Sequence, residues 1–170
     1  YLLKKVHCVI LLSENFRQQL ISAGFLSSKL TVLYNFHVIG PQDFSQSKVN
    51  RQIELLFIGS ISRRKGIIDL LEALKDINIP YNLNVLGDFS SSEIEYMCRE
   101  MVQRNNLHVN FCGYLEGKLK ETYLLNADVL VLASNAEGFP MVIPEAMAYG
   151  CSIISTYIAG IPEIVSYNFN

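Results

Sequence analysis

The chain has 170 residues, of which 14 are Lys or Arg and 16 are Asp or Glu, so its formal charge is −2. Half of the residues are hydrophobic and 18% are charged, which excludes a disordered chain, and ten Gly and five Pro are too few for a collagen-like or low-complexity one. Because nucleic-acid binding normally shows as a basic excess, this balance predicts no nucleic acid as a partner.

Short apolar runs alternate with helical patterns along the chain. The runs are leucine-rich or β-branched with little polar alternation, which is typical of strands covered on both faces. This order predicts an α/β fold, a Rossmann-like doubly wound parallel sheet. Strands are predicted at 6–12, 30–34, 53–58, 83–86, 109–111, 129–133 and 152–155, and helices at 14–23, 66–76, 91–104, 118–126 and 141–149, with Ser90 and Glu93 as a capping box for the third helix.

A polar stretch at residues 35–52 interrupts this alternation and is interpreted as a linker. It separates residues 1–34 from an α/β domain expected at 53–170. Because the chain starts at Tyr1 rather than Met, with a strand already under way, we expect it to be a piece of a longer protein. Four cysteines without a C-x-x-C spacing favour reduced thiols, mostly buried, in a cytoplasmic protein. No run approaches the ~18 apolar residues needed to cross a bilayer.

The segment after the strand predicted at 53–58 carries three consecutive cations. Ligands of doubly wound sheets bind beyond the carboxyl ends of the strands, so chemistry is expected in such segments. Cations just before a helix N-terminus are unfavourable unless an anion is present. A phosphate held by Lys65 and helix N–H groups would resolve this conflict, while Arg63 and Arg64 also fit as solvated loop residues. The spacing matches neither a Walker P-loop nor G-x-G-x-x-G, which argues against a nucleoside triphosphatase or a dinucleotide dehydrogenase.

The segment after the strand predicted at 129–133 carries two carboxylates. Pro144 is tolerated only in the first turn of a helix, so the helix should begin near residue 141. Glu137 then lies in the loop above the sheet and Glu145 about one turn into the helix, so both side chains can face one crevice. An acidic side chain also suits a helix N-terminus on dipole grounds alone, which leaves a purely structural role open for Glu145.

Several motifs, in register along the chain, resemble the retaining glycosyltransferases of family 4 (group 1), which have the GT-B fold. They are the pair of glutamates at 137 and 145, EAMAYG at 145–150, KG at 65–66 and GIPE at 160–163. Two glutamates at this spacing are common by themselves, but the combination in this order is specific. The resemblance covers about residues 53–165 and implies the C-terminal, nucleotide-sugar-binding half of such an enzyme.

The resemblance implies a donor that is a UDP- or GDP-sugar, transferred with retention to a hydroxyl of a glycan or glycolipid acceptor, without a metal or a cofactor. Glu137 would be the catalytic group near the reacting centre. Glu145 would bind the ribose, since a carboxylate can accept hydrogen bonds from two neighbouring hydroxyls. Lys65 and the Gly59 turn would hold the diphosphate, and main chain near Tyr114 would meet the base. The implied donor-binding residues are Gly59, Ser60, Arg64, Lys65, Tyr114, Gly138, Phe139, Pro140 and Glu145.

Two features depart from the family pattern. Arg often follows the first glycine, but here the residue is Ser60, so either Arg63 or Arg64 supplies the charge or the diphosphate is bound more weakly. Residues 1–34 resemble only the tail of the N-terminal acceptor domain and its crossover. We therefore expect this chain alone to bind donor without turning it over.

Other functions remain open at this level. They are a non-catalytic nucleotide-sugar-binding module, a nucleotide-sugar epimerase or a phosphorylase of the same fold type, and a glycoside hydrolase using the two glutamates. A hydrolase needs two carboxylates but leaves the cationic loop unexplained. For the transferase, the family implies polysaccharide or glycolipid biosynthesis in the cytoplasm, with peripheral contact at the inner face of the membrane left open.

Overall fold

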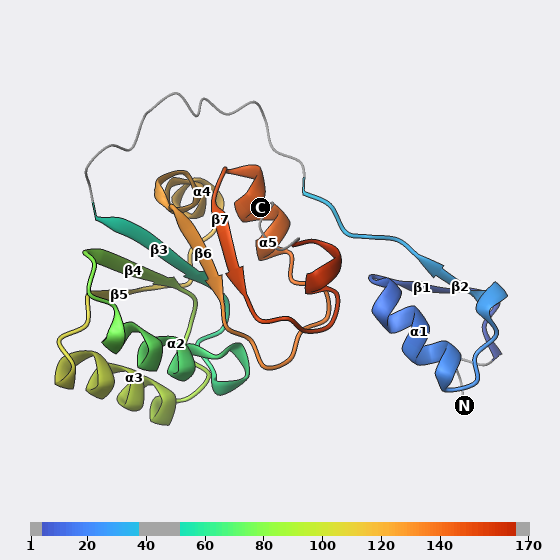
Figure 1. Cartoon of the computed structure of the whole chain (residues 1–170), viewed down its shortest axis with the longest axis horizontal. Coiled ribbons are helices and arrows are strands. Elements are labelled where there is room, and N and C mark those ends of the chain that lie inside the picture. The colour runs from blue at the N-terminus through green and yellow to red at the C-terminus, as the bar shows by residue number, and fades with distance from the viewer. Residues whose placement is uncertain (1–4, 38–51, 166–170) are drawn as a thin grey trace.

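The structure is a computed structural model that describes residues 5–37 and 52–165, so most of the predicted linker lies outside the described residues. Within them, five parallel strands form one sheet in the order β5-β4-β3-β6-β7, and two parallel strands, β1 and β2, form a separate pair (Figure 1). The doubly wound parallel sheet predicted from the sequence is confirmed. The strands are β1 (Val9–Leu11), β2 (Leu30–Val32), β3 (Ile53–Ile58), β4 (Tyr81–Leu86), β5 (Val109–Gly113), β6 (Val129–Leu132) and β7 (Ser152–Ser155), and the α-helices are α1 (Glu14–Ser22), α2 (Ile67–Ala73), α3 (Ser92–Arg104), α4 (Gly117–Asn126) and α5 (Val142–Ala148).

The central strand β3 is buried on both faces, as its unbroken apolar sequence predicts. Phe57 packs in a core with α2 and α3, whereas Leu56 packs in a second core with α4 and α5. Figure 1 shows the same division, with α2 and α3 on one side of the sheet and α4 and α5 on the other. The two apolar layers hold the sheet rigid beneath the loops at the carboxyl ends of its strands.

Strands β4 and β5, toward one edge of the sheet, do not follow this pattern. In β4, half-buried Asn82 and Asn84 alternate with buried side chains. The amide of Asn110 on β5 donates to both of their side-chain oxygens, at 2.9 and 3.2 Å. The prediction that the strands are covered on both faces is therefore wrong for this edge of the sheet, where a ladder of amides replaces an apolar layer.

Two predicted helix starts are shifted for local reasons. Ser91, not Ser90, caps α3, and its hydroxyl accepts from the Ile94 N–H at 3.3 Å. The Ser90 N–H donates to the Ile61 carbonyl oxygen at 3.0 Å, which ties the residue before the cap to the loop after β3. The helix predicted at 66–76 consists of α2, which begins at Ile67, and the 3₁₀ turn η4 (Leu74–Asp76), and a separate 3₁₀ turn, η3 (Arg63–Lys65), precedes it.

The four cysteines, all among the described residues, form no disulfide. Cys98 and Cys151 are buried, Cys112 is partly buried and Cys8 is exposed, so the expectation of mostly buried thiols holds for half of them. Burial raises the pKa of the Cys98 thiol to about 11, which keeps it protonated and unreactive near neutral pH. Among the described residues, none of the helices has both the length and the apolar character of a membrane span.

Gly66 and Gly113 offer a matched test of the packing around the loop after β3. Both have left-handed backbones, with φ of +72° and +73°. A Cβ at Gly66 would lie 1.8 Å from the Ala133 carbonyl oxygen, whereas one at Gly113 would meet nothing within 4 Å. Gly113→Ala should lower the free energy of unfolding by about 1–2 kcal/mol, the cost of the left-handed conformation. Gly66→Ala should lower it by more than about 4 kcal/mol, because backbone must move as well. Urea denaturation measures both, and equal losses would contradict the packing described.

Candidate functional site

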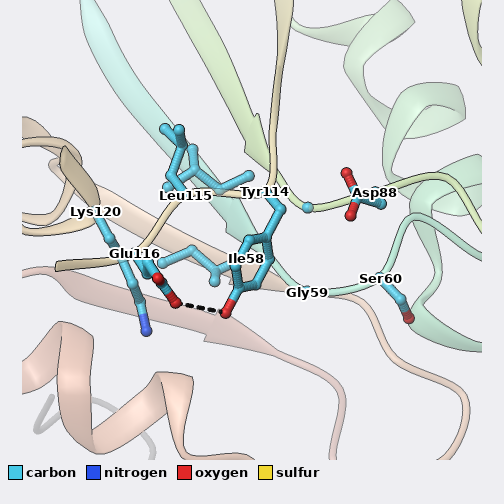
Figure 2. A pocket seen from close by; sticks show the side chains of 10 residues that line it. Ile58, Gly59, Ser60, Asp88, Tyr114, Leu115, Glu116 and Lys120 are labelled. Atoms are coloured by element: carbon cyan, nitrogen blue, oxygen red, sulfur yellow. Dashed lines mark hydrogen bonds between the residues drawn. The ribbon is translucent and has the colours of Figure 1, made fainter.

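The carboxyl ends of β3, β4, β5 and β6 lie at one edge of the sheet, because all four strands are parallel. The strand order reverses at β3, with β4 on one side and β6 on the other. Crevices form at such switch points, since the loops from the two sides diverge there. A cavity of about 340 Å³ opens on the β4 side of this point, over the carboxyl ends of β3, β4 and β5 (Figure 2). It is lined by Ile58, Gly59, Ser60, Leu86, Gly87, Asp88, Tyr114, Leu115, Glu116 and Lys120.

The loop after β3 forms its own short turn at the cavity. Ser62 caps η3, and its hydroxyl accepts from the Lys65 N–H at 3.3 Å. Gly66, in the left-handed conformation, then separates η3 from α2, so the three cations do not directly precede the α-helix as the sequence predicted. The Lys65 chain runs beside Gly59, where an added Cβ would lie 3.7 Å from the Lys65 Cε. The lysine therefore projects along the same turn that lines the cavity.

Lys65 forms an ion pair with Glu137 across the switch point. The Lys65 Nζ lies 2.6 Å from the Glu137 Oε1, and the Ser134 hydroxyl donates to the same oxygen at 2.6 Å. Only 16% of the Lys65 side chain and 6% of the Glu137 side chain are exposed. Glu137 comes from the loop after β6, so this pair joins the loops of two neighbouring strands. An ammonium has three N–H donors, and those not bound to Glu137 can bind an anion.

The two arginines beside Lys65 point in different directions. The Arg64 guanidinium donates to the Ala136 carbonyl oxygen at 3.0 Å, and the Arg64 carbonyl oxygen accepts from the Asn135 N–H at 2.8 Å. Arg63 instead reaches the Met97 Sδ on α3 at 3.1 Å. Arg64 therefore lies against the Glu137 loop, whereas Arg63 lies on the far side of its turn. Of the two, only Arg64 is placed to add charge near Lys65.

Glu145 is held by a lysine that sequence reasoning missed. The Lys120 Nζ on α4 lies 2.6 Å from the Glu145 Oε2 on α5, with 23% and 17% of the two side chains exposed. Lys120 also lines the cavity, so it connects Glu145 to the cavity wall. The only signal in the sequence was a lysine in the first turn of the helix that follows β5. Its partner could not be read from spacing, because the two residues lie on different helices.

Tyr114 and Glu116 form the outer wall of the cavity. The Tyr114 hydroxyl donates to the Glu116 Oε2 at 3.1 Å, and this bond raises the pKa of the phenol, which therefore stays protonated. Figure 2 shows the Tyr114 ring beside Ile58 with its hydroxyl directed toward Glu116. The ring itself is 66% exposed. Neither Glu116 nor Asp88, both of which line the cavity, was singled out from the sequence.

The loop predicted to approach the sugar turns toward the N-terminal segment. Gly138 is exposed, Phe139 is half-buried and Pro140 is buried. The Phe139 ring packs against the Tyr34 ring, with centroids 6.2 Å apart and planes tilted by 47°. The loop therefore begins at the Lys65 pair and ends against the segment that follows β2.

The predicted site residues thus gather around one edge of the sheet. Gly59, Ser60 and Tyr114 line the cavity, Lys65 runs beside Gly59, and Glu145 is bound to the cavity-lining Lys120. The two glutamates are bound by different lysines rather than by one another. Among the residues that the structure describes, no cluster of three His, Cys, Asp or Glu side chains could hold a metal ion.

Comparison with known proteins gives the family and confirms the fold. The profile of the family "Glycosyl transferases group 1" matches residues 39–170. An uncharacterized 41.2 kDa protein in the cps region of Klebsiella pneumoniae is 28% identical over 97% of this chain and 47% of its own length. The lipopolysaccharide 1,6-galactosyltransferase of Escherichia coli is 25% identical over 94% of this chain and 45% of its own.

The solved structures agree on the fold. Anabaena HepE, in complex with UDP and glucose, superposes with a TM-score of 0.82 at 23% identity, over 97% of this chain and 48% of HepE. The chain thus spans less than half the length of each of these three proteins. The five-stranded sheet and its helices correspond to one half of a GT-B glycosyltransferase.

The Lys65 pair should contribute to stability because it is largely buried. Lys65→Met would leave the Glu137 carboxylate bound to the Ser134 hydroxyl but without its lysine, and we expect a loss of about 3 kcal/mol in the free energy of unfolding. Lys75→Met breaks the more exposed Lys75–Glu72 pair and should change it by less than about 0.5 kcal/mol. Urea denaturation of both variants measures the difference. A Lys65→Met variant as stable as the wild type would show that the pair is not buried as described.

Proposed function

Because the chain belongs to the group 1 glycosyltransferases, we propose that its larger domain binds a nucleotide-diphosphate sugar in the cavity over the carboxyl ends of β3, β4 and β5, next to the switch point. The observation that carries the proposal is the Lys65–Glu137 pair, which places an ammonium at the cavity turn and a carboxylate beside it. HepE, with the same fold, binds UDP and glucose according to its structure, which supports a nucleotide-sugar donor here as well.

The diphosphate would be bound at the loop after β3. Lys65 supplies a partly buried positive charge next to the Gly59 turn, and Arg64 adds a second cation against the Glu137 loop. An anion held by a lysine in a partly buried place is stabilised more than one in water, because the local dielectric is lower. We therefore assign the diphosphate contacts to Gly59, Ser60, Arg64 and Lys65.

The nucleoside would occupy the cavity itself. Glu145 can accept hydrogen bonds from two neighbouring ribose hydroxyls, and Lys120 holds its carboxylate at the cavity wall. The base would lie toward Tyr114, where main chain after β5 is accessible from the cavity. In this arrangement Lys120 acts as a positioning residue, because it binds Glu145 rather than the donor.

The sugar would project toward Glu137 and the loop 138–140. The reaction breaks the bond between the anomeric carbon and the diphosphate oxygen, and the electron pair leaves with the nucleoside diphosphate. The acceptor hydroxyl oxygen forms the new bond to the same carbon, and its proton passes to the departing diphosphate. Lys65 would stabilise this departing charge electrostatically, and no metal is assigned to the reaction. We propose transfer with retention of anomeric configuration, with Glu137 as the catalytic group beside the reacting centre and Gly138, Phe139 and Pro140 as donor contacts.

The acceptor would be bound mainly by the other half of a GT-B enzyme, since these 170 residues span less than half the length of their relatives. The proposed acceptor is a glycan or glycolipid hydroxyl, as the lipopolysaccharide substrate in the name of the Escherichia coli relative suggests. We propose that the enzyme acts in the cytoplasm, where nucleotide sugars would reach it, and that contact with the inner face of the membrane depends on the acceptor domain. The family membership favours this transferase reading over the binding-module, epimerase, phosphorylase and hydrolase alternatives.

Titration with UDP-glucose, UDP and GDP-mannose tests the donor site. We expect the wild-type chain to bind one nucleotide series, and Lys65→Ala and Glu145→Ala each to weaken that binding at least about tenfold, because each removes a charged contact. Lys75→Ala, which lies in an exposed ion pair away from the cavity, is the matched control and should bind like the wild type. Calorimetry on variants with native circular dichroism gives the affinities. Undiminished binding in both site variants would discard the residue assignments.

The proposal that the acceptor is bound by the other half of the enzyme can be tested by turnover. The chain should bind donor but transfer no sugar, because a GT-B enzyme needs both halves to bring donor and acceptor together. Release of UDP from UDP-glucose in the presence of lipid-linked or oligosaccharide acceptors measures turnover. Sugar transfer by the 170 residues alone would contradict this expectation.

A further inference from the structure

The GIPE motif ends in a carboxylate that the proposed donor site does not use. Glu163 closes the short 3₁₀ turn η5 (Ile161–Glu163) after β7. Its Oε2 accepts from the Glu14 N–H at 2.7 Å and from the Tyr34 hydroxyl at 2.9 Å, and its Oε1 accepts from the Asn15 N–H at 2.8 Å. One side chain thus binds three donors that lie about 130–150 residues earlier in the sequence. We call this arrangement the Glu163 clamp.

The clamp completes the N-terminal cap of α1. The first N–H groups of a helix have no partner within it, and Ser13 satisfies one of them by accepting from Phe16 N–H at 3.2 Å. Glu163 satisfies the two that precede it, those of Glu14 and Asn15. A carboxylate at this end of a helix is also favoured by the helix dipole. The helix therefore depends on a residue of the larger domain for its complete cap.

Close packing accompanies these hydrogen bonds. Ser13 is completely buried, although it lies at the start of a surface helix. A Cβ at Gly160 would lie 2.9 Å from the Ser13 Cβ, so only glycine allows the two segments to approach this closely. Ala159, just before it, has a φ of +49°, which turns the chain toward α1. The two segments are thus in close contact, and the Glu163 carboxylate lies at the edge of this contact.

The clamp also extends toward the donor loop. Tyr34, whose hydroxyl binds Glu163, packs its ring against Phe139. Phe139 lies two residues after Glu137, the partner of Lys65. A chain of contacts therefore runs from the α1 cap through Glu163, Tyr34 and Phe139 to the loop at the switch point.

We propose that Glu163 is a positioning residue for the transfer reaction. It joins the β1–α1–β2 unit to the larger domain and, through Tyr34 and Phe139, holds the loop 138–140 in place for the sugar of the donor. The second half of this inference depends on the proposed function. The first half, that Glu163 caps α1 and fixes the unit to the domain, depends only on the contacts above.

Amide hydrogen exchange of the full chain tests the cap. In Glu163→Gln one acceptor oxygen and the negative charge are lost, so exchange of the Glu14 and Asn15 N–H groups should accelerate about fivefold or more. The Phe16 N–H, bound by Ser13, should change less. Glu93→Gln is the matched control, because Glu93 is an exposed glutamate in the first turn of α3, where Ser91 makes the cap. Unchanged exchange of Glu14 and Asn15 in a folded Glu163→Gln variant would overturn the clamp.

The affinities for UDP-glucose and UDP distinguish a positioning role of Glu163 from a purely structural one. Glu163→Gln should weaken UDP-glucose about threefold or more while UDP weakens less, because the Phe139 loop faces the sugar and not the nucleotide. Tyr34→Ala should weaken the binding of UDP-glucose in the same way, while amide exchange of Glu14 and Asn15 in this variant stays slow. This variant provides the same test if Glu163→Gln does not fold. Equal weakening of both ligands, or of neither, would overturn the positioning role. If the wild type binds neither UDP-glucose nor UDP, the proposed function is wrong, and with it the role of Glu163 in positioning the loop 138–140. The exchange rates of Glu14 and Asn15 still test whether Glu163 caps α1.

Discussion

One ion pair, between Lys65 and Glu137, holds together the edge of the sheet on which the proposed function depends. Lys65 comes from the loop after β3 and Glu137 from the loop after β6, so the pair crosses the line where the strand order reverses. Partial burial makes such a pair costly to break, since either residue alone would leave a charge poorly solvated. The pair therefore fixes two loops that the sheet alone would let diverge, and it keeps a cation ready at the cavity turn.

The second ion pair, between Lys120 and Glu145, likewise joins two separate elements. Lys120, which lines the cavity, joins α4 to Glu145 on α5, so the Glu137 and Glu145 carboxylates are each held by a lysine before a ligand arrives. Sites that are organised in advance lose less free energy on binding. The amide ladder of β4 and β5 lies on the same sheet but forms no part of this arrangement, and it shows that polar side chains in a parallel strand need not mark a ligand site.

Sequence patterns predicted which loops carry the candidate site residues, because turn residues, a proline and runs of like charge determine local structure. The loops after β3 and β6 were chosen from the three cations at 63–65 and from Glu137 and Glu145, and the two loops meet at the Lys65–Glu137 pair. Contacts between distant segments could not be predicted in this way. The rotation of α4 that brings Lys120 to Glu145 depends on core packing, and the residue before the α3 cap, Ser90, is hydrogen-bonded to Ile61 in another loop. The capping of α1 by Glu163 likewise depends on how two units of the chain meet.

A crystal structure of this chain with UDP-glucose would test the central assignment most directly. The assignment predicts diphosphate oxygens within hydrogen-bond distance of the Lys65 ammonium and ribose hydroxyls on the Glu145 carboxylate, with the uracil toward Tyr114. A ligand bound elsewhere on the chain, with both ion pairs unchanged and the cavity empty, would contradict it.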